Sequence, residues 1–408
     1  MHVLGASMLV TVIGLAAVSA VRLQIRAAQR ATDDVTARAC AVSAVELGLL
    51  YVTQDPNWRT TWPNGVWMSD KPLGDVTFTL EGIDPEDGDL TDSEFEPLVL
   101  TGIGMKGIAR HKTQVRLVPE FRALSCLGAA LHAGGNIWLA ASGDTINAAG
   151  GPVSCNNQVS NQATINGDVE ANSITGVGTI NGTATAPAPP REMPDDATLF
   201  TYYQSIGTSI SIWSLPTVSG TQTIPENYLG PDHNPYDTQV TDPNGIYVID
   251  CQGQDLHFRN ARIVGTLVLL NAGSLSRIYN SVSWEQPQSD PGTGARFPSL
   301  LVQGNIEFCF TDTALDESSL GDLNNDGDAV DTYPSVIKGL VYVSGEIVAV
   351  AAAQTCEGVV ITGADFETLS NNVVHLTYDG TFFDNYPPGF GAPARMNISP
   401  SSWQQVVD

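Results

Sequence analysis

A short acidic segment near residue 322 has the residue types and the spacing of a cation-binding loop. Oxygen-bearing side chains recur at every second position around Gly327, and one more carboxylate follows; they are Asp322, Asn324, Asp326, Asp328 and Asp331. This spacing directs alternate side chains toward one hard cation, as in the first half of a Ca²⁺ loop. Tyr333 stands at the twelfth position, where an EF-hand needs a bidentate glutamate, so this is not an EF-hand. The segment predicts a structural Ca²⁺ site, with a solvated acidic turn as the alternative.

A second acidic segment, near residue 84, is less regular. Its candidate metal ligands are Asp84, Glu86 and Asp89, and Asp87 and Asp92 lie in the same stretch. We expect this segment to connect two strands of a small sheet. In either segment the role of Ca²⁺ would be structural, because a cation would hold together an acidic loop whose carboxylates otherwise repel one another.

The cysteines are even in number, which is compatible with disulfide bonds in an oxidising compartment. They are Cys40, Cys126, Cys155, Cys251, Cys309 and Cys356. We expect the pairs Cys126–Cys155 and Cys309–Cys356, with buried free thiols as the alternative. The absence of any Cys-x-x-Cys motif argues against zinc or redox chemistry.

The remaining chemistry-bearing residues give no catalytic pattern. Six histidines are scattered without metal-ligand spacing, and the sequence contains no nucleophile elbow, phosphate loop or dinucleotide fingerprint. Carboxylates that a β-helix could bring to an outer groove, as in polysaccharide-cleaving enzymes, are Asp250, Asp255, Glu307 and Asp312. Because scattered carboxylates are expected in so acidic a chain, we predict that the protein is not an enzyme.

Charge and composition narrow the class of protein. The 408 residues contain 44 acidic and 18 basic side chains, for a formal charge of −26. Such a field repels phosphate backbones, which excludes nucleic acid as a partner. With 39 glycines, 24 prolines and only 15% charged residues, the composition favours strands and turns over a helical bundle.

The elements that position these residues begin with a long helix. Residues 3–21 are uncharged and about long enough to span a bilayer core. Their large side chains are candidates for contact with a membrane or with other helices, namely Leu4, Leu9, Ile13, Leu15 and Val21. A cleaved secretory signal is the competing interpretation. Apolar residues then recur at helical spacing at Val35, Val42, Val45 and Leu49, so we expect one helix that ends at Asp55-Pro56.

The N-terminal segment resembles that of PilX-type pilus-assembly proteins, which are minor type IV pilin-like proteins. The resemblance rests on the stretch Gly5-Ala6-Ser7-Met8-Leu9-Val10 and on Ala41-Val42-Ser43-Ala44-Val45-Glu46-Leu47. It implies a helix that is stored in the inner membrane and later packs against other pilin-like subunits, carrying a head of three or four strands. The family's usual early glutamate is missing, since no acidic residue precedes Asp33. This difference favours a minor or tip subunit, and a plain signal-anchor is the alternative.

The rest of the chain predicts two β-rich parts. Alternating runs at residues 76–80, 98–104 and 113–118 indicate a small antiparallel sheet behind three tryptophans. From residue 124 onward, short strands open with glycine. Gly339, Gly358 and Gly380 are spaced by about one coil of a right-handed parallel β-helix. Residues 184–244 interrupt this pattern with a proline-rich linker and a short helix capped by Asp195, and we expect the C-terminal tail to cap the coil.

The sequence therefore predicts a mostly β protein with a long N-terminal α-helix. The expected parts are the helix (1–54), a pilin-like head (55–122), a β-helix domain (123–395) and a tail (396–408). We expect a structural cell-surface protein, a membrane-anchored and extracytoplasmic minor or tip pilin-like subunit of a filament. The alternative is a membrane-anchored β-helix that binds or cleaves polysaccharide.

Overall fold

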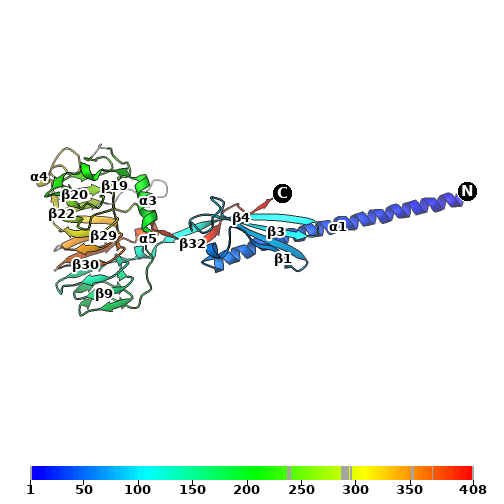
Figure 1. Ribbon diagram of the computed structural model, residues 1–408, viewed down its shortest axis with the longest axis horizontal. Coiled ribbons are helices and arrows are strands. Elements are labelled where there is room, and N and C mark those ends of the chain that lie inside the picture. Colours follow the sequence, from blue (N-terminus) through cyan, green and yellow to red (C-terminus); the bar gives the residue numbers. More distant parts are fainter. Residues whose placement is uncertain are drawn as a thin grey trace. The chain divides into compact units, whose positions relative to one another are not determined.

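The computed structural model describes residues 2–236, 240–285, 294, 296–350, 353–369 and 371–406. The chain forms two compact units (Figure 1). One comprises Met1–Arg122 together with Pro393–Asp408, and the other comprises Ala123–Ala392. The first combines a long helix with an antiparallel sheet, and the second consists mainly of short parallel strands.

The first unit is built on helix α1 (His2–Gln54), which ends at the predicted Asp55-Pro56 stop. Its sheet has the order β1-β2-β3-β4-β32, with β33 also paired to β4, and β1 to β4 run antiparallel. The other elements of this unit are α2 (Trp58–Thr61), β1 (Gly65–Leu73), β2 (Val76–Ile83), β3 (Leu98–Lys106), β4 (Ala109–Ala123), β32 (Gly391–Ile398) and β33 (Gln404–Val406). The expected head of a helix packed on a small sheet is present, with additional strands at both edges.

The helix contacts the sheet through small side chains. Ala37, Ala41 and Val45 are fully buried, whereas Val35, which we expected on this face, is 68% exposed. The reason lies in β3, where Gly104 lies directly beneath the helix backbone. A Cβ atom at Gly104 would lie 2.0 Å from the carbonyl oxygen of Ala37. At Gly104 the helix approaches so closely that alanine lies on it, whereas Val45, farther along the same face, is buried over Gly102.

The predicted tryptophan cluster closes one end of this core. Trp62 stacks on Trp67 at a ring-centroid distance of 5.4 Å and on Tyr51 at 5.1 Å. Trp58 and Trp67 are both buried in the same apolar cluster as Val45. The rings therefore bury the rim of the sheet against the helix, as the sequence predicted.

The C-terminal tail corrects one expectation. It does not cap the coil, because β33 pairs antiparallel with β4, with Gln405 opposite Thr113. Beside it, Asn397 Nδ2 donates a hydrogen bond to Glu120 of β4 at 2.8 Å, and Arg395 forms an ion pair with the same carboxylate. Polar partners on β4 thus recruit the tail to the antiparallel sheet.

In the second unit, three ladders of parallel strands run side by side. The first contains β15 (Thr208–Ser209), β19 (Ile246–Asp250), β21 (Thr266–Leu270), β23 (Leu300–Val302), β27 (Val336–Val343), β29 (Ala353–Thr362), β5 (Leu131–Ala133), β8 (Val153–Cys155), β11 (Val169–Glu170) and β14 (Ala184–Thr185). The second contains β17 (Thr221–Ile224), β20 (Leu256–Val264), β22 (Arg277–Glu285), β24 (Ile306–Phe310), β28 (Ile347–Ala349), β30 (Phe366–Thr368), β6 (Ile137–Leu139), β9 (Gln158–Asn161) and β12 (Ser173–Thr175). The third reuses β20, β22, β27 and β29 and adds β18 (Tyr228–Leu229), β31 (Val373–Tyr378), β7 (Thr145–Ala149), β10 (Thr164–Asn166) and β13 (Thr179–Ile180).

The register of these ladders aligns like residues. Gly339 pairs with Gly358, which confirms the predicted period at that point, and Val341 pairs with Val360. Gly380 does not open a strand: the residues after it form the short helix α5 (Thr381–Asp384). The remaining elements of this unit are η1 (Ser125–Gly128), η2 (Ile212–Ser214), β16 (Thr217–Val218), β25 (Leu315–Asp316), α4 (Glu317–Leu320) and β26 (Thr332–Tyr333).

The strands do not stack in simple chain order. The last turn of chain pairs with the first, since β29, β30 and β31 pair with β5, β6 and β7. Figure 1 shows this as orange β30 above teal β9. The unit's two ends therefore meet, and the Leu124 N–H donates to the Phe390 carbonyl at 2.9 Å.

The interruption at residues 184–244 contains the predicted helix, α3 (Asp196–Ile206). The Asp195 side chain caps it by accepting a hydrogen bond from the Thr198 N–H at 3.0 Å. Leu199, Phe200 and Tyr203 pack into a second apolar cluster outside the first ladder. The same segment also supplies β15 to β18, so it extends the ladders as well as interrupting them.

Candidate functional site

The apolar half of α1 is exposed. Leu15 is 71% exposed and Leu9 is 64% exposed, with Ile13 and Val21 also more than half exposed. Leu4 lies among residues whose side chains the structure does not describe. By length and composition, α1 could cross a membrane. Such an exposed apolar surface is unfavourable in water.

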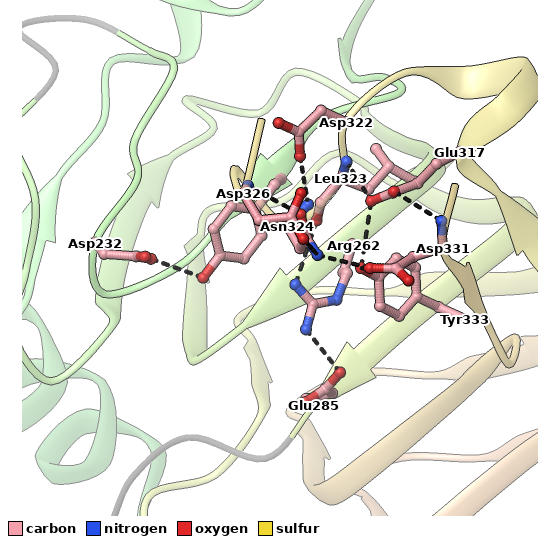
Figure 2. Close-up of polar contacts among 11 residues, drawn as sticks. Asp232, Arg262, Glu285, Glu317, Asp322, Leu323, Asn324, Asp326, Asp331 and Tyr333 are labelled. Carbon is pink, nitrogen blue, oxygen red and sulfur yellow. Dashed lines mark hydrogen bonds and ion pairs between the residues drawn. The ribbon is translucent and has the colours of Figure 1, made fainter. Parts of the chain in front are cut away.

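The predicted cation loop near residue 322 is held by a buried glutamate. Residues 317–331 connect the antiparallel strands β25 and β26. Glu317, the first residue of this connection, is only 1% exposed. Its carboxylate accepts hydrogen bonds from the N–H groups of Leu323 at 2.7 Å and Asp331 at 3.1 Å, and from the Tyr333 hydroxyl at 3.2 Å. Figure 2 shows these bonds meeting at Glu317. Glu317, which the sequence did not single out, organises the loop.

The predicted ligands of this loop bond to the loop itself. Asp322 accepts from the N–H groups of Asn325 at 2.6 Å and Gly327 at 2.9 Å. These bonds, the one from Gly327 foremost, lower the pKa of Asp322 below its ordinary value. The Asn324 amide nitrogen lies between two other predicted ligands and donates to Asp326 at 2.8 Å and Asp331 at 2.9 Å (Figure 2). Asp328 accepts from the Val330 N–H at 3.2 Å.

An arginine supplies positive charge beneath this loop. Arg262 donates to the Leu323 carbonyl at 3.3 Å and to Glu285 at 2.9 Å. Its guanidinium lies over the Tyr333 ring at 4.4 Å from the centroid and over the Tyr228 ring at 5.2 Å. The loop is therefore anchored to the body of the unit by hydrogen bonds and stacking, and the Ca²⁺ site expected in it stays a prediction.

The other predicted loop, residues 84–97 between β2 and β3, brings a different set of carboxylates together. Oxygens of Asp84, Asp87 and Glu96 lie within 4.8 Å of one another. Of the expected ligands only Asp84 belongs to this group: Glu86 lies 3.9 Å from Arg116, and Asp89 accepts from Thr91. No pattern in the sequence pointed to Glu96, which lies at the far end of the loop.

The electrostatics of this group are unfavourable. Asp84 is 2% exposed, and neither its Oδ2 nor Glu96 Oε2 has a hydrogen-bond donor. A proton on Glu96 would form a hydrogen bond to Asp84 and reduce the repulsion between the two carboxylates. This hydrogen bond is the largest cause that raises the pKa of Glu96 to about 7, and burial is the second. Three oxygen ligands directed at one point are suited to a hard divalent cation.

The expected disulfide bonds are absent. All six cysteines are free in the structure, including Cys126, Cys155, Cys309 and Cys356. Cys155 and Cys356 point into the core between the ladders, whereas Cys126 belongs to the cluster outside it and Cys309 lies beside Glu307 on the outer face. Each expected pair is thus divided by a wall of strands, and burial raises the pKa of Cys126 to about 12.

The candidate groove carboxylates on the second unit do not converge. Glu307 forms an ion pair with Arg277 at 2.9 Å, and Asp255 accepts from the Leu275 N–H at 2.9 Å. No three acidic, histidine or cysteine ligand atoms meet within 4.8 Å there among the described residues. The outer face does contain a depression of about 260 Å³, lined by His257, Arg277, Tyr279 and others.

Comparisons with known proteins leave the family unassigned. No family model matches the chain, and no curated protein matches it. Among solved structures, the competence-associated pilin ComZ from Thermus thermophilus is similar at 14% sequence identity and a TM-score of 0.34, over 92% of this chain and 98% of that one. A likeness at that level does not assign a fold.

Proposed function

We propose that this protein is a structural cell-surface subunit, a minor or tip type IV pilin-like protein that is anchored through α1. The observation that carries the proposal is the division of α1. Its C-terminal half is packed on an antiparallel sheet through Ala37, Ala41 and Val45, while residues 11–21 expose their apolar side chains.

The energetics of α1 require a covering partner. Covering a large apolar side chain contributes roughly 1.5–3 kcal/mol, and Leu9, Ile13, Leu15 and Val21 are each more than half exposed. The inner membrane would cover them before assembly, and the helices of neighbouring pilin-like subunits would cover them in the filament. The lack of charge from residue 3 to residue 21 is suited to both environments.

The second unit supports a display role. We take its three parallel ladders as a parallel β-helix, which offers a long regular surface. Part of that surface is a row of asparagines: Asn166 donates to Asn147 at 2.7 Å, and Asn181 donates to Asn166 at 2.7 Å. Such a row of amides bonded to one another gives a stable polar face without catalytic groups.

Polysaccharide binding or cleavage is the second candidate for this unit. The depression beside His257, Arg277 and Tyr279 favours it, because aromatic and hydrogen-bonding side chains together suit a sugar. A glycan array and a reducing-end assay, each with the full chain in detergent, test this candidate. Binding that Tyr279→Ala abolishes would support it.

Immunogold electron microscopy tests the leading proposal. Antibody raised against residues 123–392 would be applied to source cells and to sheared surface material. Gold along thin filaments or at their ends is the expected result, and labelling at the ends alone would indicate a tip subunit. Gold spread over the envelope beside bare filaments would refute the pilin-like role and leave an anchored β-helix.

A helix variant sharpens this test. Ile13→Asp places a charge in the exposed apolar half of α1 and should abolish filament labelling, because neither lipid nor packed helices accept an isolated carboxylate. Gln24→Asn, on the same helix, is the matched control and should label filaments as the unaltered chain does.

A further inference from the structure

The loop at residues 84–97 has a high density of negative charge. Residues 84–96 contain seven acidic side chains and neither lysine nor arginine. The Arg59 guanidinium donates to the main-chain carbonyls of Leu90 and Glu96 and lies over the Trp58 ring. It also attracts the charges of Asp84 and Glu96, but it donates no hydrogen bond to Asp84 Oδ2 or Glu96 Oε2. One arginine offsets only part of the charge of three carboxylates, so Asp84, Asp87 and Glu96 together remain negative.

The orientation of Asp84 is fixed by its neighbours. Asp84 Oδ1 accepts from the Glu86 N–H at 2.8 Å, and the Asp84 N–H donates to Asn64 Oδ1 at 2.8 Å. These bonds direct the buried Oδ2, which has no donor of its own, toward the other two carboxylates. A buried charged oxygen left without a partner is costly, so an orphan of this kind indicates a ligand.

The spacing of the oxygens fits one ligand class. Ca²⁺ binds oxygens at about 2.3–2.6 Å, so two ligands on opposite sides of the ion lie about 4.6–5.2 Å apart. The three carboxylates lie within 4.8 Å of one another and include no histidine or cysteine, which argues against zinc. Among the described residues this is the only such group.

We propose that Asp84, Asp87 and Glu96 bind a hard divalent cation, Ca²⁺ above all, with water completing the coordination. The ion joins the two ends of the loop, since Asp84 follows β2 and Glu96 precedes β3. Leu90, between them, is 1% exposed in the tryptophan core, so closing the loop also holds this apolar contact. The site does not depend on the pilin-like role.

Calorimetric titration of Ca²⁺ tests the site. The full chain in detergent, stripped with EDTA and desalted, should bind one Ca²⁺ per chain. At a hundredfold excess over the dissociation constant, the melting temperature of the first unit should rise by about 5–10 °C. Asp84→Asn and Glu96→Gln should each weaken binding at least tenfold, in the range of about 10- to 100-fold reported for altered metal sites.

Matched controls separate this ligand set from the alternatives. Asp89→Asn lies in the same loop but outside the cluster, and Asp326→Asn lies in the other acidic loop; both should leave the affinity unchanged. Failure of the unaltered chain to bind Ca²⁺, or equal binding by Asp84→Asn and Glu96→Gln, would overturn the site. Loss of binding in Asp326→Asn alone would also overturn it, by moving the ion to the other loop. If Asp84→Asn does not fold, Asp87→Asn replaces it.

Discussion

The two acidic loops begin from similar sequences and reach opposite electrostatic solutions. In the loop of residues 317–331, Asn324 lies between Asp326 and Asp331 and donates a hydrogen bond to each. In the loop of residues 84–97, the corresponding space is occupied by carboxylates alone, and Asp84 Oδ2 has no donor. The difference is that an amide donor, Asn324, lies among the carboxylates of the first loop, whereas no amide lies among Asp84, Asp87 and Glu96.

The comparison shows that similar acidic spacing can place carboxylates in different surroundings. The regular Asp-x-Asn-x-Asp-Gly-Asp motif closes through its own backbone, because Asp322 accepts from two N–H groups. In the irregular loop backbone N–H groups also bond to Asp84 Oδ1 and Asp87 Oδ1, but the buried Asp84 Oδ2 has no donor, and on our proposal an external cation takes that place. Four changes of sequence or pH test this difference, and they are ordered here by the size of the expected effect.

The largest effect is expected for Glu317→Ala. Removal of this buried carboxylate leaves the Leu323 and Asp331 N–H groups without their acceptor, while the Tyr333 hydroxyl keeps Asp331 Oδ2 at 3.3 Å. Each unsatisfied group costs about 1–3 kcal/mol, so the loop should lose about 2–4 kcal/mol of local stability. Hydrogen exchange at the amides of residues 321–331, followed by mass spectrometry, measures the loss.

Glu317→Gln is the control for that change. Glutamine keeps one acceptor oxygen and the volume of glutamate, so it should retain part of the protection. Equal exchange in Glu317→Ala and in the unaltered chain would show that the loop does not depend on this side chain.

Asn324→Asp should give the loop of residues 317–331 a cluster of carboxylates without an amide donor, like that of the loop of residues 84–97. The two amide bonds to Asp326 and Asp331 become contacts between carboxylates, at a cost of about 1–2 kcal/mol in EDTA. Ca²⁺ should then restore the lost stability, and the gain in stability should exceed the gain that Ca²⁺ gives to the unaltered chain. Melting curves with EDTA and with Ca²⁺, compared with those of Asn324→Ala, separate the gain of a cation site from the simple loss of bonds.

How far the sequence predicted these features depends on the range of the interaction. The helix stop at Asp55-Pro56 and the Asp195 cap depend on neighbours along the chain, and both were predicted. The pairing of Gly339 with Gly358 followed from a local repeat. The contact between Asp84 and Glu96 forms because β2 and β3 bring the two ends of the loop together. The spacing of these residues along the chain does not reveal that contact.

The same limit explains the errors about packing. Val35 was expected on the buried face of α1 from the spacing of apolar residues, but that face is formed by Ala37, Ala41 and Val45, which lie over Gly102 and Gly104 of β3. The disulfide pairs were chosen by separation along the chain, whereas the direction of each side chain from its strand decides which cysteines can meet. Both errors arise from contacts between elements far apart in sequence.

Unlike the substitutions above, Asp84→Asn should raise the stability of the folded chain when no divalent cation is present. The substitution keeps the oxygen that accepts from the Glu86 N–H and replaces the orphan Oδ2 with an N–H₂ donor. It should therefore stabilise the first unit by about 1 kcal/mol in EDTA, from the removed repulsion alone. A lower melting temperature for Asp84→Asn than for the unaltered chain in EDTA would contradict the picture of three crowded carboxylates.

The smallest expected effect is the loss of the stabilising contribution of the Asp322 carboxylate in acid. Hydrogen bonds from Gly327 and neighbouring N–H groups favour its charged form and lower its pKa in the folded chain below the ordinary value of about 3.9. Its stabilising contribution is therefore complete above the unfolded pKa and is lost as the pH falls through the lower folded pKa. With ¹⁵N-glycine labelling, the Gly327 amide resonance should titrate with a midpoint below about 3.9, and the Asp322→Asn variant should lack that transition. A midpoint at or above the ordinary value would show that the backbone of this loop does not hold the carboxylate, and the contrast with the loop of residues 84–97 would then lose its physical basis.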